Sequence, residues 1–286
     1  MADWRPIHAP TSGSSLVMGF ADPVSSGSSP NYGTLLTAGA ANVFGDWTWV
    51  ANAPSVPLGA LVVSLVNPSI GGGQAGNYAV QLGHATSGST QLIADKMMLQ
   101  ASRANLGTCT YALPLYLPTS GSILARVSCD TGAATLSVSV VPLPLGIMSP
   151  TVFAKSDSYG FAAGDNPDGT TITPGVTLNV KGAYAQLHAA LPSPIRYMIV
   201  MLGGRAVTSL SIALWRIDIA VGGAGAEVVI VPDLVMACVG TSDEMLPNVV
   251  GFPIYVPAGV RLSARAQCNI NDAIDSLFHI AVMGLS

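Results

Sequence analysis

The second half of this sequence repeats the first half, and this internal repeat limits the possible folds more than any other feature. Residues 113–129 align without gaps with residues 252–268. Both segments carry a Pro-x-Tyr-x-Pro run, followed after a short spacer by Ala-Arg and then a cysteine. The identical pairs, all 139 positions apart, are Pro114/Pro253, Tyr116/Tyr255, Pro118/Pro257, Ala125/Ala264, Arg126/Arg265 and Cys129/Cys268. Ordered matches of this kind indicate an internal duplication.

The repeat extends toward the N-terminus with small changes in spacing. The Asn-Val-x-Gly-x-Trp motif at residues 42–47 aligns with the Asn-Val-x-Gly-x-Tyr motif at residues 179–184. Further matches are Asp95/Asp233, Met98/Met236 and, near the start of each copy, Tyr32-Gly33/Tyr159-Gly160. The alignment then requires one insertion in the second copy, at Phe161–Thr170. Its Gly-Asp-Asn-Pro-Asp-Gly core is typical of turns.

These alignments predict an N-terminal arm at residues 1–18, a first copy at 19–146 and a second copy at 147–286. The arm is rich in Ser, Gly and Pro and has few strand signals. Two interpretations remain open for it, a disordered tail or a segment that becomes ordered on a neighbouring subunit. The insertion, with Asp165 and Asp168, makes the second copy the better candidate for a specialised contact with a glycan or a partner.

Each copy is predicted to fold as a β-sandwich. Short apolar runs with alternating character, such as residues 60–66 and 197–202, end in Gly, Pro, Ser or Asn. This pattern is typical of strands, and no capped helix of twelve or more residues is apparent. We therefore expect an all-β protein made of two tandem homologous β-sandwich domains. The strand count fits jelly-roll and immunoglobulin-like topologies equally well.

Composition excludes several functional classes. Only 9% of residues are charged, compared with about 25% in ordinary soluble domains. The basic residues are scattered and the net charge is −4, so we expect no nucleic-acid partner. The apolar runs stop well short of the ~20 residues of a membrane helix, so we expect no membrane insertion. The start of the chain lacks a signal-peptide pattern, which favours synthesis in a cytoplasm and four buried free thiols.

The sequence carries no recognisable catalytic, cofactor or metal motif. The nucleophile elbow, the phosphate-binding loop and zinc-ligand spacings are all absent. We therefore expect a non-enzymatic protein with no cofactor and no metal. Asp165 and Asp168, together with Asn166, form the one acidic cluster with calcium-ligand chemistry, and an Asx turn is the preferred interpretation.

Aromatic and arginine residues at matched positions are the best candidates for a contact surface. Exposed Trp or Tyr on a sandwich face can stack on sugar rings, which would apply to Trp47, Trp49 and Tyr184. The alternative, which we prefer, is that Trp47 and Tyr184 fill the same core position in the two copies. Arg126 and Arg265 also occupy matched positions. Each arginine could form an ion pair within the fold or contact a ligand.

Taken together, the duplication, the Gly/Ser/Thr/Ala-rich strands and the Leu-Tyr-Leu-Pro and Ile-Tyr-Val-Pro runs resemble virion proteins of tailed bacteriophages. This resemblance implies a neck, tail, fibre or capsid-decorating subunit in the virion, made in the bacterial host. It implies a homo-oligomer that contacts other virion proteins and sometimes a host-surface glycan. A double jelly-roll major capsid protein and a carbohydrate-binding adhesin are the alternatives.

Overall fold

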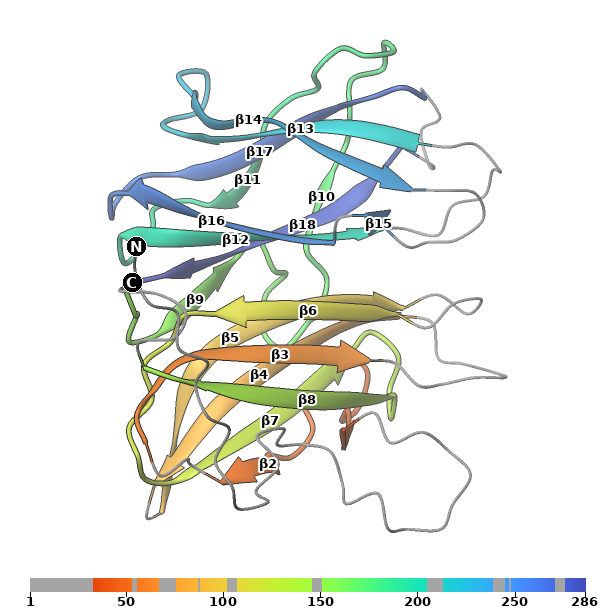
Figure 1. The fold of residues 1–286 in the computed structure, drawn as a ribbon. Coiled ribbons are helices and arrows are strands. Elements are labelled where there is room, and N and C mark those ends of the chain that lie inside the picture. The colour runs from red at the N-terminus through yellow and green to blue at the C-terminus, as the bar shows by residue number, and fades with distance from the viewer. Residues whose placement is uncertain are drawn as a thin grey trace, which may run out of the picture.

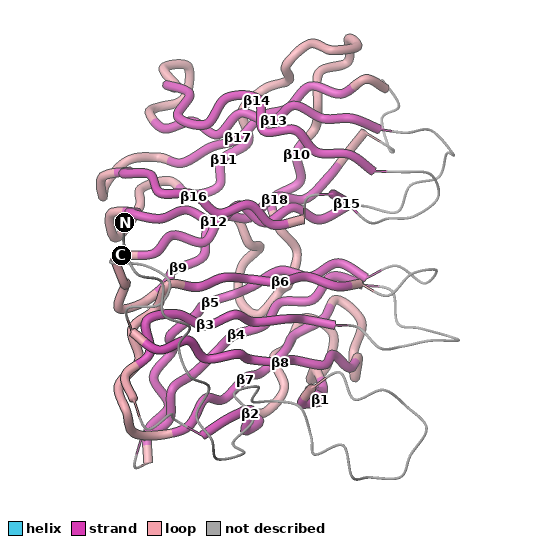
Figure 2. The backbone as a smooth tube through the Cα atoms, viewed as in Figure 1, coloured by secondary structure: helices cyan, strands magenta, loops and turns pink. Residues whose placement is uncertain are grey.

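The computed structural model describes residues 33–52, 56–66, 76–86, 88–101, 107–145, 151–204, 213–238, 245–246, 248–270 and 276–286. The predicted arm at residues 1–18 and the start of the first copy lie outside these residues. Every regular element in the described part is a strand (Figure 2). No helix in this part is long and apolar enough to cross a membrane. Figure 1 shows two stacked sandwiches, with the second copy above the first. The protein is all-β, with tandem β-sandwiches, as the sequence predicted.

The first sandwich consists of two four-stranded sheets. Its strands are β1 (Thr34–Thr37), β2 (Thr48–Asn52), β3 (Leu58–Val66), β4 (Gly76–Thr86), β5 (Ser89–Ala101), β6 (Thr108–Leu113), β7 (Ser122–Cys129) and β8 (Thr135–Pro144). One sheet has the order β1-β8-β3-β6, and the other has the order β2-β7-β4-β5. Side chains that alternate toward the inside of both sheets fill the core, among them Val63, Tyr111 and Val138.

The second sandwich repeats this arrangement. Its strands are β9 (Ser156–Tyr159), β10 (Thr170–Ile172), β11 (Ala185–His188), β12 (Ile195–Gly204), β13 (Ala213–Val221), β14 (Val228–Cys238), β15 (Met245–Leu246), β16 (Val249–Val256), β17 (Leu262–Cys268) and β18 (Phe278–Leu285). One sheet has the order β16-β12-β18, with β9 and β10 both paired to β18. The other has the order β11-β17-β13-β14-β15.

The strand order identifies the topology that the sequence left open. In the first copy, each connection between the eight strands crosses from one sheet to the other, except for the β4–β5 hairpin. Eight strands that cross between two four-stranded sheets in this way form a jelly roll, whereas an immunoglobulin-like domain places its strands in a different order. The corresponding strands of the second copy follow the same order. The protein is therefore a tandem of two jelly rolls.

The strand ladders correct the alignment of one strand pair. Leu99 and Met236 occupy equivalent places, because each lies opposite the large buried residue of the preceding strand, Tyr78 or Trp215. Met98 is therefore not the counterpart of Met236, and the sequence alignment of β5 with β14 is one residue out of register. A one-residue shift moves every side chain to the other face of a strand, so this correction matters for the site below.

The start of the second copy also differs from the alignment. Gly33 and Gly169 occupy equivalent places, since a Cβ atom on either would press on the carbonyl oxygen of the last strand, at Val138 or Ile280. Thr170 also pairs with Ile280 as Thr34 pairs with Val138. Gly160, which the sequence aligned with Gly33, directly follows β9 instead and lies beside Ile280 and Ala281 of β18. Of the extra residues predicted at 161–170, all but Thr170 lie in the connection between β9 and β10, and Thr170 begins β10.

The two sandwiches share one sheet as a boundary between two cores. Alternate residues of β12 and β18 point into the second sandwich, whereas the others pack against the core of the first. The second group comprises Ile199, Met201, Ala281, Met283 and Leu285. This double burial explains why all eight residues of β18 are buried. Burying each large apolar side chain contributes about 1.5–3 kcal/mol, so the two copies form one body.

Strand β9 continues this connection at the edge of the first sandwich. Ala94 in β5 pairs with Ser156 in β9, which joins sheets of both copies into one nine-stranded sheet. The neighbouring backbone N–H of Asp95 donates to the Ser156 hydroxyl at 3.3 Å. In the second copy the residue in register with Asp95 is Pro232, which has no N–H to donate. This position of β14 therefore cannot donate the backbone hydrogen bond that Asp95 of β5 donates to Ser156 of β9.

The four cysteines are free thiols inside the two sandwiches, as the sequence predicted. Burial raises the pKa of Cys109 and of Cys129 to about 12. A thiol with such a pKa carries almost no thiolate at neutral pH.

Candidate functional site

The repeated Asn-Val-x-Gly motif is a turn that docks onto the second sheet of each copy. The Asn42 N–H donates to the Cys129 carbonyl at 2.7 Å, and the Asn179 N–H donates to the Cys268 carbonyl at 2.9 Å. Both asparagines have a positive φ, near 60°, which asparagine tolerates better than most residues. Gly182 lies so close to the neighbouring backbone that a Cβ atom would be 2.6 Å from the Thr173 carbonyl oxygen. The backbone geometry of the turn therefore explains why Asn and Gly recur in this motif.

This turn places an aromatic ring on the outer face of the sheet, over the matched arginine. The Arg126 guanidinium lies 4.5 Å from the ring centre of Trp47, and the Arg265 guanidinium lies 4.5 Å from that of Tyr184. The prediction that Trp47 and Tyr184 are equivalent is confirmed, but the prediction that they fill a core position is wrong. Both rings are half-buried on the outside of the sandwich. In the first copy, Gly83 leaves room for the Trp47 ring to lie on the sheet.

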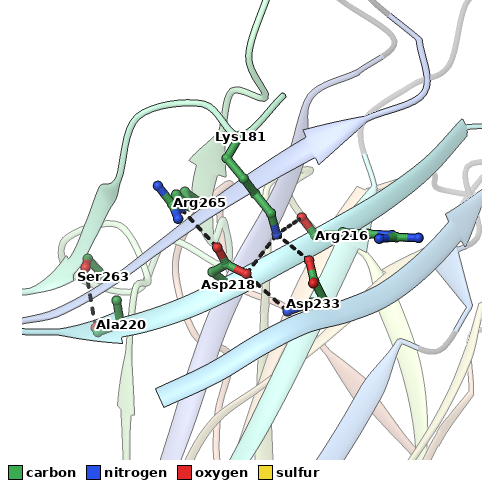
Figure 3. A network of polar contacts seen from close by, with 7 residues as sticks. All are labelled: Lys181, Arg216, Asp218, Ala220, Asp233, Ser263 and Arg265. Carbon is green, nitrogen blue, oxygen red and sulfur yellow. Dashed lines mark hydrogen bonds and ion pairs between the residues drawn. The ribbon is translucent and has the colours of Figure 1, made fainter. Parts of the chain in front are cut away.

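In the second copy, a network of ion pairs neutralises the arginine (Figure 3). Arg265 Nε donates to Asp218 at 3.0 Å, and Lys181 Nζ donates to Asp218 at 2.8 Å and to Asp233 at 2.9 Å. Burial alone would raise the pKa of Asp218, but the hydrogen bonds from Lys181, from the Asp233 N–H and from Arg265 outweigh it and hold that pKa below its usual value. Here the matched arginine is part of an ion pair within the fold.

In the first copy, neutral and aromatic residues replace most of this network. Gln81 stands in the place of Asp218, and Phe44 stands in the place of Lys181. Arg126 Nε donates to Gln81 Oε1 at 2.8 Å, and the Phe44 ring centre lies 4.7 Å from the guanidinium. The Gln81 amide then donates to Asp95 at 2.8 Å. Among the residues that the structure describes, Arg126 forms no ion pair.

Trp49 extends this face in the first copy. It lies opposite Leu124 in the neighbouring strand, two residues before Arg126, and 53% of its surface is exposed. The matched position in the second copy is Gln186, which accepts a hydrogen bond from Arg261. We call the group Phe44, Trp47, Trp49, Gln81 and Arg126 the aromatic-arginine face. It combines an exposed ring with a cation that has no acidic partner among the described residues.

The connection between β9 and β10 carries Asp165 and Asp168 and folds back onto the first copy. The Asn77 amide donates to Asp168 Oδ1 at 2.5 Å, and the Phe44 N–H donates to Asp165 Oδ2 at 3.3 Å. The predicted Asx turn is present, since the Asp168 N–H donates to the Asn166 side chain at 2.8 Å. The insertion therefore contacts the first copy through both aspartates.

Lys96 fixes this connection from the first copy. Its ammonium group donates to the backbone carbonyls of Gly164 and Asn166, and it lies 5.2 Å from the ring centre of Phe161. Burial lowers the pKa of Lys96, and the charges of Asp95 and Asp165 partly oppose this effect. The carbonyl contacts explain how a buried lysine is tolerated.

A polar cleft of about 350 Å³ lies where the copies meet, beside the aromatic-arginine face. Its lining residues are Gln81, Asp95, Lys96, Ser158, Tyr159, Gly160, Phe161, Ala162, Gly164, Asp165, Leu187 and His188. His188 Nδ1 accepts a hydrogen bond from the Ala190 N–H at 3.3 Å, and the His188 ring packs edge-on against Tyr159. Burial, with the charges of Asp157 and Asp95, raises the pKa of Tyr159 to about 12.

A second cavity of about 370 Å³ is apolar and lies on another side of the junction. Phe153 and Tyr197 line it, with their ring centres 6.3 Å apart. The described residues contain no group of three or more His, Cys, Asp or Glu side chains placed to hold a metal ion.

Comparisons with known proteins give little further information. No family model matches the chain, and no curated protein is similar to it. The N-terminal CBM22-1–CBM22-2 tandem domain from Paenibacillus barcinonensis Xyn10C is a similar solved structure, with a TM-score of 0.26 and 10% sequence identity. The likeness covers 82% of this chain and 79% of that chain. Similarity at this level carries no argument about function.

Sequence analysis identified Trp47, Trp49 and Arg126 but missed Gln81, Phe44 and Lys96. The difference between Gln81 and Asp218 is visible in the alignment of the two copies, at the same spacing as the Asn-Val-x-Gly motif. The importance of this difference is seen only when the contacts of Gln81 and Asp218 with the two arginines are known. Lys96 gives no signal in the sequence, because its partners are backbone carbonyls.

Proposed function

We propose that this protein is a non-enzymatic glycan-binding protein of the adhesin type, with the aromatic-arginine face of the first copy as its binding surface. The observation that carries the proposal is the half-exposed Trp49 beside the Trp47–Arg126–Phe44 stack. Aromatic rings present an apolar face to sugar rings, and nearby polar side chains fix the orientation of a ligand.

The surroundings of the face support the same proposal. The turn at residues 42–45 and the sheet beneath it hold the rings in place, so little side-chain order has to be gained on binding. Gln81 and Asp95 extend from the face into the junction cleft, where they provide hydrogen-bonding groups. A rigid aromatic surface next to a polar cleft suits a ligand that has both apolar ring faces and hydroxyl groups.

Binding to an array of glycans tests this proposal, followed by titration calorimetry with any glycan that binds. Trp49→Ala should reduce affinity at least tenfold and leave the thermal unfolding midpoint unchanged. Tyr255→Ala removes a similarly exposed ring from the second copy and serves as the matched control. If the protein binds no glycan, or if Trp49→Ala and Tyr255→Ala behave alike, the proposal is wrong.

A structural subunit of a virus particle is the second candidate, and the jelly-roll tandem favours it. Jelly rolls occur both in viral capsids and in lectin domains, so the fold alone does not choose between the candidates. The rigid union of the two copies through a shared core, together with the low charge of the chain, suits a building block. A neck, tail, fibre or decoration subunit and a double jelly-roll major capsid protein are both compatible with these features.

Quantitative mass spectrometry of purified particles from the source tests the second candidate. Hundreds of copies per particle would favour a capsid or decoration role, and a small multiple of three or six would favour the neck, tail or fibre. Truncation of residues 1–18 should weaken assembly if the arm contacts a neighbouring subunit. Absence of the protein from particles would contradict the virion role and leave the adhesin.

A further inference from the structure

The two copies carry the same arginine in different electrostatic surroundings. Arg265 lies 3.0 Å from the carboxylate of Asp218, and its positive charge is neutralised within the fold. Arg126 has the same position and the same aromatic contact at 4.5 Å, but its hydrogen-bond partner is the neutral side chain of Gln81. The duplication therefore provides an internal comparison between an arginine with an acidic partner and an arginine whose hydrogen-bond partner is neutral.

We propose that the first copy binds acidic glycans, with the Arg126 guanidinium pairing with a carboxylate group of the sugar. This inference rests on the proposed glycan-binding function and names its ligand class. A guanidinium group recognises a carboxylate through two parallel hydrogen bonds, and such charge-assisted bonds are stronger than neutral ones. Gln81 occupies Nε of Arg126, which leaves the terminal nitrogens of the guanidinium for the ligand.

The neighbouring acids do not provide the missing partner. Asp95 accepts hydrogen bonds from the Gln81 amide at 2.8 Å and from the Ser158 N–H at 3.3 Å. Asp165 accepts one from the Phe44 N–H at 3.3 Å. Both residues line the cleft at the junction of the copies. The carboxylate of a sugar that stacks on Trp49 would therefore meet Arg126 as its ionic partner.

The rings around Arg126 fit the same role. Phe44 and Trp47 hold the guanidinium by cation–π contacts at 4.7 and 4.5 Å, which fixes its plane before a ligand arrives. In the second copy, Lys181 takes the place of Phe44 and donates to two acids instead. The second copy therefore presents a self-neutralised face, and we infer one acidic-glycan site per chain.

The variant Gln81→Asp tests the inference because it gives Arg126 an acidic partner like the one that Arg265 has in Asp218. Calorimetric titration of the full chain would compare sialyllactose with lactose, and oligogalacturonate with neutral galactose oligomers. The wild type should bind each acidic glycan that it recognises at least tenfold more tightly than the neutral counterpart. Gln81→Asp should remove that preference. Its thermal unfolding midpoint is measured in parallel, because the variant also loses the hydrogen bond that the Gln81 amide donates to Asp95. Raising the salt concentration should weaken binding to the acidic glycans alone.

Gln91→Asp is the matched control, because it adds the same charge at an exposed position of the same sheet. It should leave the preference for acidic glycans intact. Equal binding of acidic and neutral glycans, or an equal loss in both variants, would overturn the inference while the proposed glycan-binding function stands. A protein that binds no glycan of either kind would overturn both.

Discussion

Val282 and Met283 are neighbours in β18 but belong to different hydrophobic cores. Val282 packs inside the second jelly roll, whereas Met283 packs against the core of the first. Both side chains are fully buried, since their strand lies in a sheet that is covered on both faces. The contact between the copies is therefore built like a protein interior, and the tandem should unfold as one unit.

Met283→Ala should lower the free energy of unfolding by about 2–5 kcal/mol, because it leaves a cavity between the two jelly rolls. Denaturant titration measures this loss, and calorimetry should show a single transition in both the wild type and the variant. Tyr255→Ala, at a side chain that is 68% exposed, should change stability by less than about 0.5 kcal/mol. Two separate transitions, with only one affected by Met283→Ala, would show that the copies unfold independently.

Gly45→Ala and Gly182→Ala should both destabilise the protein by more than about 1 kcal/mol. Both glycines lie in the turn that supports the aromatic ring. A Cβ atom on Gly45 would press on the carbonyl oxygen of Thr37, and one on Gly182 would press on that of Thr173. Gly223→Ala is the control, since a Cβ atom there would meet nothing within 4 Å. Thermal unfolding provides the measurement. Wild-type midpoints in the two turn variants would mean that these turns adapt to a side chain.

The Asp218 network should make the protein less stable in acid. The folded pKa of Asp218 lies below its usual value of 3.8, so its contribution to stability is complete above that pH and is lost as pH falls through the folded pKa. Urea unfolding at several pH values between about 7 and 2 should show a smaller dependence on pH in Asp218→Asn. Parallel curves for the wild type and the variant would exclude this carboxylate as the cause.

Lys96→Ala should loosen the connection between β9 and β10 without unfolding either sandwich. The ammonium group of Lys96 donates hydrogen bonds to two backbone carbonyls of this connection. The substitution removes this donor from both carbonyls. Hydrogen exchange should therefore become faster at residues 161–169 than in the wild type. Lys155→Ala removes an exposed ion pair with Asp157 and should leave exchange in this segment unchanged. Identical exchange in Lys96→Ala would show that the segment is held by its other contacts.

The sequence by itself determined the class of fold and the duplication. Alternating apolar runs can bury one face only as strands, and a repeated order of matched residues indicates two similar domains. It also placed the equivalence of Trp47 with Tyr184 correctly, because the spacing within the Asn-Val-x-Gly turn is the same in both copies. Periodicity did not distinguish between jelly-roll and immunoglobulin-like order, since both use short alternating strands.

Only the tertiary structure decided which side of the sheet each candidate residue faces and what it contacts. Trp47 could not be assigned to the outer face from its sequence, because a large aromatic residue suits a core and an arginine stack equally well. The partners of Asp165 and Lys96 are far away along the chain and are mainly backbone groups, which carry no sequence signal. Gln81 and Asp218 contact arginine side chains that are also far away along the chain. Their difference acquires a meaning only when the folded chain brings an arginine against each of them.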